Sequence, residues 1–297
     1  MKKIITHNGS FHADEIFACA ILSILNNNKV EIIRSRDPEV WEMGDYVVDV
    51  GGVHNEKKNR FDHHQVGGGG KRENGIPYSS MGLVWKLYGK KVSGSAEVAK
   101  LVDEKLVQPI DAVDSGVSLF SLINPEVFPY SINNVLGALR PTWKEEAGDK
   151  ESIDEGFAVA LNLAKDILLR EIKIARDQIE ANKFVLKAYN KAKDKRVIVI
   201  EGHYPCDEIL LKFSEPLFVV KPDHQDETKW KVKTVRKGSD SFEARKFLPV
   251  KWSGKKGEEF AKITGVKDSI FCHVNCFVAV AGSKAGALKL AELALNN

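Results

Sequence analysis

The chain has 297 residues, 43% of them hydrophobic and 29% charged, which excludes a disordered or fibrous protein and leaves room for two globular domains. The formal net charge of +3 is too small for overall basicity to indicate nucleic-acid binding, and four scattered cysteines exclude a disulfide framework. Without a signal-like start or a run of roughly 18 apolar residues, the sequence predicts a cytoplasmic protein that does not enter a membrane.

Strands and helices alternate at the start of the chain. The expected strands there cover residues 4–5, 30–33 and 46–50, and the expected helices cover residues 14–25, 81–88 and 95–107. Such an alternation predicts an α/β fold with a mostly parallel sheet and helices on its faces. We assign residues 1–145 to this N-terminal domain.

The middle of the chain, residues 146–194, reads as a helical connector. Apolar residues such as Phe157, Leu161 and Ala164 recur at spacings of three and four, which predicts one or two long helices within residues 150–193. The expected strands that follow cover residues 196–200, 217–220, 230–235 and 277–281, before a final helix at residues 285–295. This pattern predicts a smaller C-terminal α/β domain, residues 195–297.

The first motif of chemical interest lies between the first expected strand and the first expected helix. It contains His7, His12 and Asp14 within a short polar loop. Open α/β sheets place their ligands at loops that follow the carboxyl ends of parallel strands, so these side chains are candidate metal ligands. The alternative is a polar loop in which Asp14 only begins the helix.

A second motif places Asp49 at the tip of an apolar strand, followed by Gly51 and Gly52. Burying a carboxylate there is unfavourable unless a cation or several hydrogen-bond donors compensate its charge. The motif therefore indicates a second metal-ligand position. A turn that begins at Asp49 is the alternative.

Two further motifs combine the same residue types. Adjacent His63 and His64 follow Asp62, a carboxylate that could orient one of the imidazoles, although paired histidines can also be polar surface. Asp111 and Asp114 lie three residues apart at the end of an expected helix and can share one face. Carboxylates are unfavourable near the C-terminal end of a helix, so a cation is expected close to them.

The four motifs together offer imidazole and carboxylate ligands, which suit Mn²⁺, Mg²⁺ or similar six-coordinate ions better than a structural zinc ion. Their order is H-x4-H-x-D, V-V-D-V-G-G, F-D-H-H-Q and D-A-V-D-S-G. This order resembles the DHH superfamily of metal-dependent phosphoesterases and, within it, the melanocyte proliferating gene (Myg) family. The resemblance extends over nearly the whole chain and includes the later segment G-A-L-R-P-T-W at residues 137–143.

The resemblance implies a DHH-type N-terminal domain that binds two divalent ions, Mn²⁺ in the first place with Mg²⁺ as the alternative. The implied metal ligands are His7, His12, Asp14, Asp49, His63 and Asp114. Asp49 would bridge the two ions and His64 would face substrate phosphate, which makes these two the expected catalytic residues. Many members of the superfamily have H-x3-D-x-D in the first motif, so this sequence departs from them at His12.

Two aspartates are expected to support the ligands from outside the metal shell. They are Asp62 and Asp111, and Asp111 could exchange roles with Asp114. The resemblance also implies that cations bind the phosphates of the substrate, for which the candidates are Arg140, Arg236, Arg245, Lys251 and His273. The alternative, which is the more common case for any single cation, is a solvated surface charge.

The implied activity is that of a 3′-5′ exonuclease acting on RNA or short oligonucleotides, with two ions activating water. A small-molecule phosphohydrolase, acting on pyrophosphate or cyclic dinucleotides, is the alternative because similar metal sites serve such substrates. A third hypothesis, a catalytically inert binding protein, is disfavoured by the presence of every metal motif. The oligomeric state is not predicted.

Overall fold

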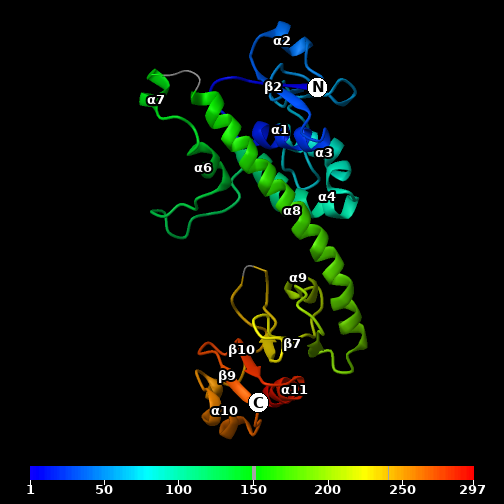
Figure 1. Ribbon diagram of the computed structural model, residues 1–297, viewed down its shortest axis with the longest axis vertical. Helices are drawn as coiled ribbons and strands as arrows, with labels where there is room; N and C mark the ends of the chain where they lie inside the picture. Colours follow the sequence, from blue (N-terminus) through cyan, green and yellow to red (C-terminus); the bar gives the residue numbers. More distant parts are fainter. Residues whose placement is uncertain (149–151, 240) are drawn as a thin grey trace. The chain divides into compact units, whose positions relative to one another are not determined.

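The computed structural model describes residues 1–148, 152–239 and 241–297 and divides into two compact units, Met1–Arg176 and Asp177–Asn297. Each unit has its own five-stranded sheet, which confirms a mixed α/β protein. Helix α8 (Ser152–Lys191) is one continuous helix that begins in the first unit and ends in the second (Figure 1). Lys150, the expected start of this helix, lies outside the described residues. In the described part of the chain, no helix is both long enough and apolar enough to cross a membrane.

The sheet of the first unit is mostly parallel, as predicted. Its order is β2-β1-β3-β5-β4, and only β4 runs antiparallel to its neighbour. The strands are β1 (Lys2–Thr6), β2 (Val30–Arg34), β3 (Tyr46–Val48), β4 (His54–Asn55) and β5 (Arg60–Phe61). Strand β3 ends two residues before its predicted end because Asp49 has a left-handed backbone with φ of 55°.

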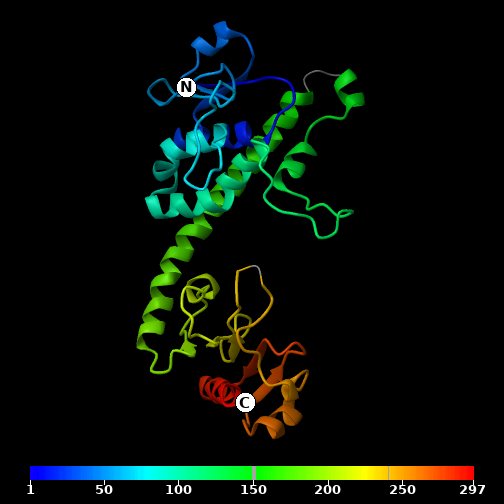
Figure 2. The ribbon, with the colours of Figure 1, turned by 180° about the vertical axis from the view of Figure 1, so that it is seen from behind.

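Helices pack around this sheet, and α1 and α3 form the most extensive helix pair of the unit. They are α1 (Ala13–Leu25), α2 (Pro38–Glu42), η1 (Glu56–Lys58), α3 (Ser80–Ser93), α4 (Ala96–Val102), the π-helical turn η2 (Asp103–Val107), α5 (Gln108–Asp114), α6 (Ile132–Gly137) and α7 (Trp143–Gly148). The single helix expected at residues 95–107 is therefore α4 followed by η2. Residues 117–131, between α5 and α6, project as a loop without regular structure (Figure 2).

The sheet of the second unit has the order β6-β7-β8-β10-β9, with one parallel pair, β6 and β7, and antiparallel pairs elsewhere. Its elements are β6 (Val197–Val199), α9 (Asp207–Leu210), β7 (Phe218–Pro222), β8 (Trp230–Thr234), η3 (Val250–Trp252), α10 (Gly257–Thr264), β9 (Ser269–Cys272), β10 (Val278–Ala281) and α11 (Lys284–Leu295). The sequence did not predict β9 or α10. Strand β9 has four residues and α10 has eight, and elements this short are poorly detected from the periodicity of the sequence.

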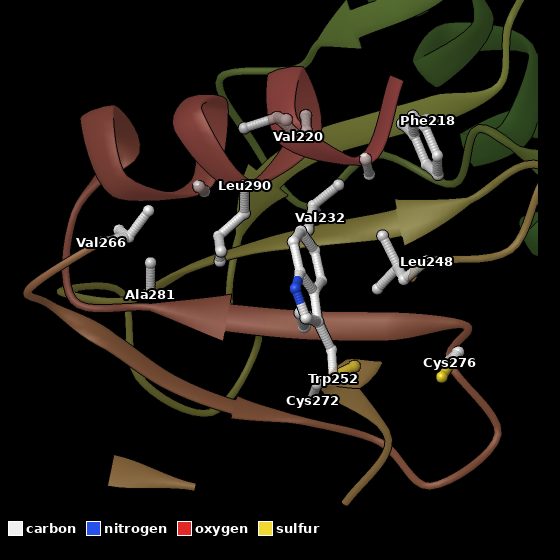
Figure 3. Close-up of a cluster of buried hydrophobic side chains, with 14 of the residues drawn as sticks. Phe218, Val220, Val232, Leu248, Trp252, Val266, Cys272, Cys276, Ala281 and Leu290 are labelled. Carbon is white, nitrogen blue, oxygen red and sulfur yellow. The ribbon is translucent and has the colours of Figure 1, made fainter. Parts of the chain in front are cut away.

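Alternating side chains give this second sheet two buried faces. Phe218 and Val220 belong to the core beneath α11, which also contains Trp252, whereas Val219 belongs to a second core completed by α8. Figure 3 shows Leu290 pointing from α11 toward the sheet, with the Trp252 indole beside the strands. The sheet is thus covered on both sides within the second unit.

Candidate metal centre

The first unit contains a cavity of about 940 Å³, open to solvent, at the carboxyl edge of its sheet. His7 follows β1, Asp49 follows β3, and the segment from Asp62 to His64 follows β5. Because these three strands are parallel neighbours, their carboxyl ends meet at one edge and bring the motifs together. The start of α1 adds Asp14, and the end of α5 adds Asp114.

Asp49 lies at the centre of this cluster and is buried. Its Oδ1 is 3.1 Å from Nε2 of His63, and its Oδ2 is 3.3 Å from Nε2 of His7, so the two oxygens face different imidazoles. The Ser80 hydroxyl donates a hydrogen bond of 3.0 Å to Oδ1. Burial opposes the charged carboxylate, but the contacts with His63 and His7 outweigh it and hold the pKa of Asp49 far below its usual range.

His63 joins Asp49 to two other acids. Its Nε2 is 3.2 Å from Oδ2 of Asp114 and 3.7 Å from Oδ2 of Asp14. Both oxygens of Asp14 are buried and accept no hydrogen bond from the described residues. Burial, followed by the negative charge of Asp49, raises the pKa of Asp14, and burial also raises the pKa of Asp114. A cation would relieve this concentration of acids.

Glu15 is a site residue that the sequence analysis missed. It is fully buried, its Oε1 lies 3.2 Å from Nε2 of His7, and the same atom accepts a 2.7 Å hydrogen bond from the His12 backbone. Burial disfavours the imidazolium of His7, yet the hydrogen bonds to Asp49 and Glu15 raise its pKa to about 10. The signal available in the sequence was a second acid directly after Asp14, followed at once by the apolar run that begins at Ile16.

Asp62 orients His64 and the loop around it. Its Oδ1 accepts hydrogen bonds from the backbone amides of His63 and His64 and lies 2.8 Å from Nδ1 of His64. Its Oδ2 accepts a 2.6 Å bond from the Gly52 amide. The His64 side chain is 63% exposed and lines the cavity, whereas the neighbouring His63 imidazole is almost covered.

Asp111 has a different environment from Asp114. Its Oδ1 accepts hydrogen bonds from the Ser79 hydroxyl and the Gly82 amide at the start of α3, and its Oδ2 is 2.6 Å from Nη1 of Arg72. Gly82 permits this approach, since a Cβ there would lie 2.0 Å from Oδ2. Burial raises the pKa of Asp111 to about 6, although Ser79 and Arg72 oppose the shift. This carboxylate joins α5 to α3.

The donor set fits divalent metal ions. Within the described residues, four overlapping groups place their ligand atoms within 4.8 Å of one another: His7, His12 and Glu15; Asp14, Glu15 and Asp49; Asp49, His63 and His64; and Asp14, His63 and Asp114. Buried carboxylate oxygens without hydrogen bonds, those of Asp14 and Oε2 of Glu15, lie in these groups. Mixed oxygen and imidazole ligands suit ions such as Mn²⁺.

Cationic side chains also line the cavity. Arg140, a predicted phosphate ligand, lies there, and its guanidinium donates to the Phe11 carbonyl and covers the Phe11 ring. The turn that contains Leu139 and Arg140 lies against Gly156 of α8. It can approach the helix this closely because a Cβ at Gly156 would lie 2.4 Å from the Leu139 carbonyl oxygen. Arg36, which the sequence analysis did not select, is an exposed second cation of the lining.

The other four predicted phosphate ligands belong to the second unit. The Arg245 guanidinium donates to the backbone carbonyls of Phe213 and Pro216, at 2.6 and 3.1 Å. Arg236 covers the ring of Phe242 at 5.2 Å. The remaining two are Lys251, which is exposed on η3, and His273, whose Nδ1 accepts a hydrogen bond from the Asn275 amide. Their part in substrate binding stays a prediction.

Fold and site together define an α/β protein with a His, Asp and Glu cluster suited to divalent metals at the carboxyl edge of a parallel sheet. The MYG1_exonuc family model, described as an uncharacterised protein family (UPF0160), matches residues 3–295, and the chain belongs to this family. It is 32% identical to the MYG1 exonuclease of Rattus norvegicus, covering 99% of this chain and 84% of the relative. The MYG1 protein of Dictyostelium discoideum is 33% identical over 99% of this chain and 96% of its own length. The human MYG1 exonuclease is 31% identical, with 99% and 85% covered.

Proposed function

We propose that the chain is a metal-dependent exonuclease of the DHH superfamily that removes nucleotides from the 3′ end of RNA or short oligonucleotides. The observation that carries the proposal is Asp49, whose two oxygens face two imidazoles from the segments after two different strands, inside a cluster of buried acids. Relatives from rat and human that match almost the whole chain carry the name exonuclease. The 3′-5′ direction and the preference for RNA rest on the family resemblance.

Two ions, Mn²⁺ in the first place, would share the Asp49 carboxylate. His7 is suited to hold one ion, and Asp14, His63 and Asp114, whose ligand atoms lie within 4.8 Å of one another, are suited to hold the other. His12 and Glu15 lie close enough to His7 to complete the first set. When bound, such ions acidify water and neutralise the charge that develops on phosphate oxygens.

The surrounding side chains bind and orient the substrate. Arg140 and Arg36 bring positive charge to the cavity that holds the acids, so a phosphodiester meets cations on the protein side. His64 is exposed to the cavity and held by Asp62, which suits it to donate a hydrogen bond to a phosphate oxygen. The apolar part of the lining includes Trp41 and Val113.

The test combines metal analysis with a substrate panel. Protein purified without chelator is analysed for bound metals and then assayed with Mn²⁺ or Mg²⁺ on single-stranded RNA, single-stranded DNA, dinucleotides, pyrophosphate and cyclic dinucleotides. RNA labelled at its 5′ end should give a ladder that shortens from the 3′ end. Hydrolysis confined to pyrophosphate or cyclic dinucleotides would replace the proposal by a small-molecule phosphohydrolase. Absence of turnover with every metal and substrate would reject the enzyme altogether.

A further inference from the structure

A second cavity, of about 630 Å³, lies wholly within the second unit. It is bounded by the last turns of α8, by β6 and by the first turns of α11. Its volume is in the range of pockets that bind small molecules, roughly 300–1,000 Å³. None of the residues of the metal cluster belongs to this cavity.

One wall of this cavity is aromatic. The rings of Phe184 from α8 and Tyr204 from the loop after β6 stack with their centroids 4.4 Å apart and an interplanar angle of 6°. Phe184 is 43% exposed, although Ala181 and Val185 on the same helix are buried. The stacked pair therefore offers a flat apolar surface against which another planar ring can pack.

Lysines surround the aromatic wall. Lys187 and Lys191 follow Phe184 by three and seven positions along α8 and share its face of the helix, and Lys193 follows the helix end. In the ranges that the structure describes, none of these three lysines forms an ion pair. Lys187 and Lys191 are four residues apart, a spacing at which like charges destabilise a helix. An anion bound between them would remove this repulsion.

The acids that line the same cavity already have partners. Oδ2 of Asp194 is 2.7 Å from Nη2 of Arg196, and Glu201 pairs with Lys284 of α11. The charge left uncompensated in the cavity is therefore positive. A ligand that matches both walls carries a negative charge beside a planar ring, a combination that a nucleoside phosphate supplies.

We propose that this cavity binds a nucleotide unit of single-stranded nucleic acid, with its base against Phe184 and its phosphates beside Lys187 and Lys191. A bare anion would use the lysines and leave the aromatic wall unoccupied. Positive grooves with exposed stacking rings are the usual means of binding single strands without reading their sequence. The choice of nucleic acid as the ligand rests on the proposed function. The site binds the substrate and takes no part in the chemistry.

Binding is measured with the full chain in EDTA, which prevents metal-dependent hydrolysis, by fluorescence anisotropy of a short single-stranded RNA. Phe184→Ala should weaken binding about tenfold, the loss of one base stack. The double variant Lys187→Ala/Lys191→Ala should lower the slope of log affinity against log salt by about 1.4, since each phosphate contact contributes about 0.7. The matched control, Lys262→Ala/Lys267→Ala, removes two exposed lysines of the second unit outside the cavity and should keep the parental slope.

Thermal unfolding of each variant checks that the fold is retained. Equal losses in the two lysine double variants would overturn the proposal, because binding would then follow net charge alone. Parental affinity in Phe184→Ala would overturn it as well. Calorimetry with adenosine monophosphate separates a free nucleotide from a strand, and sensitivity to Phe184→Ala with either ligand supports the site. RNA binding that depends on Phe184 in a chain without hydrolytic activity would refute the proposed function and leave this site standing.

Discussion

Asp49→Asn removes the charge at the centre of the cluster while keeping its shape. Asn is among the few residues that accept the left-handed backbone found here, with φ of 55°, so the loop after β3 should survive. The carboxylate faces His63 through one oxygen and His7 through the other, at 3.1 and 3.3 Å. A neutral amide keeps one acceptor oxygen and cannot bridge two cations.

The loss of metal affinity should exceed about 100-fold, because changing a group that merely supports a ligand already weakens metal binding by about 10–100-fold. A factor of about 100 is roughly 2.7 kcal/mol. Turnover should fall at least as far, since both ions would share this carboxylate. The free energy of unfolding of the metal-free protein should change by less than the free energy of metal binding. The variant loses its ion pairs with His7 and His63, but it also loses the repulsion between Asp49 and Asp14. This repulsion exists in the parent, where burial and then the charge of Asp49 raise the pKa of Asp14.

Metal content after dialysis, calorimetric Mn²⁺ titration, phosphodiester turnover and thermal unfolding are compared between parent and variant. Asp45→Asn is the matched control. It makes the same chemical change immediately before β3, at the opposite end of this strand from the cluster, where Asp45 pairs with Lys2 at 2.6 Å. The control should keep metal and turnover. Turnover near the parental value in Asp49→Asn at equal metal content would refute the shared-carboxylate assignment.

Four further outcomes are expected. His64→Ala should retain metal and lose at least about tenfold in turnover, because its imidazole faces the cavity, and unchanged kinetics would exclude a role at substrate phosphate. Glu15→Gln should weaken metal binding about 10–100-fold in a calorimetric titration, whereas parental affinity would limit this buried acid to helix capping. Gly82→Ala should destabilise the fold by about 3–5 kcal/mol in urea unfolding, because the added Cβ would displace Asp111. Gly137→Ala is the control, since no atom lies within 4 Å of the Cβ added there. The pKa of Asp111 is raised to about 6, so its contribution to the free energy of unfolding is present below about pH 4 and is lost as pH rises through about 6. Urea unfolding in EDTA near about pH 4 and about pH 7 should show a smaller decline in this free energy for Asp111→Asn than for the parent, and equal declines would contradict the shift.

The sequence by itself determined the kind of sheet in the first unit and the motifs at its edge. Apolar runs such as Val47–Val48 alternate with helical periodicity, and this alternation leaves few arrangements other than a parallel sheet. Because parallel strands end at one edge, His7, Asp49 and His63 had to come close together, and the structure brings them within hydrogen-bonding range. The long helix α8 was also predictable from the sequence, since its apolar residues recur at helical spacing over many turns.

Only the tertiary structure decided how each acid is used. Asp111 and Asp114 are equivalent by spacing on α5, yet the first contacts Arg72 and the start of α3, whereas the second lies 3.2 Å from His63. Glu15 shows the same limit, because its burial depends on the packing of α1 and not on the helix itself. Spacing along the chain fixes which residues share an element, but the charge that a carboxylate meets depends on distances across elements, and these distances are set only when the elements pack.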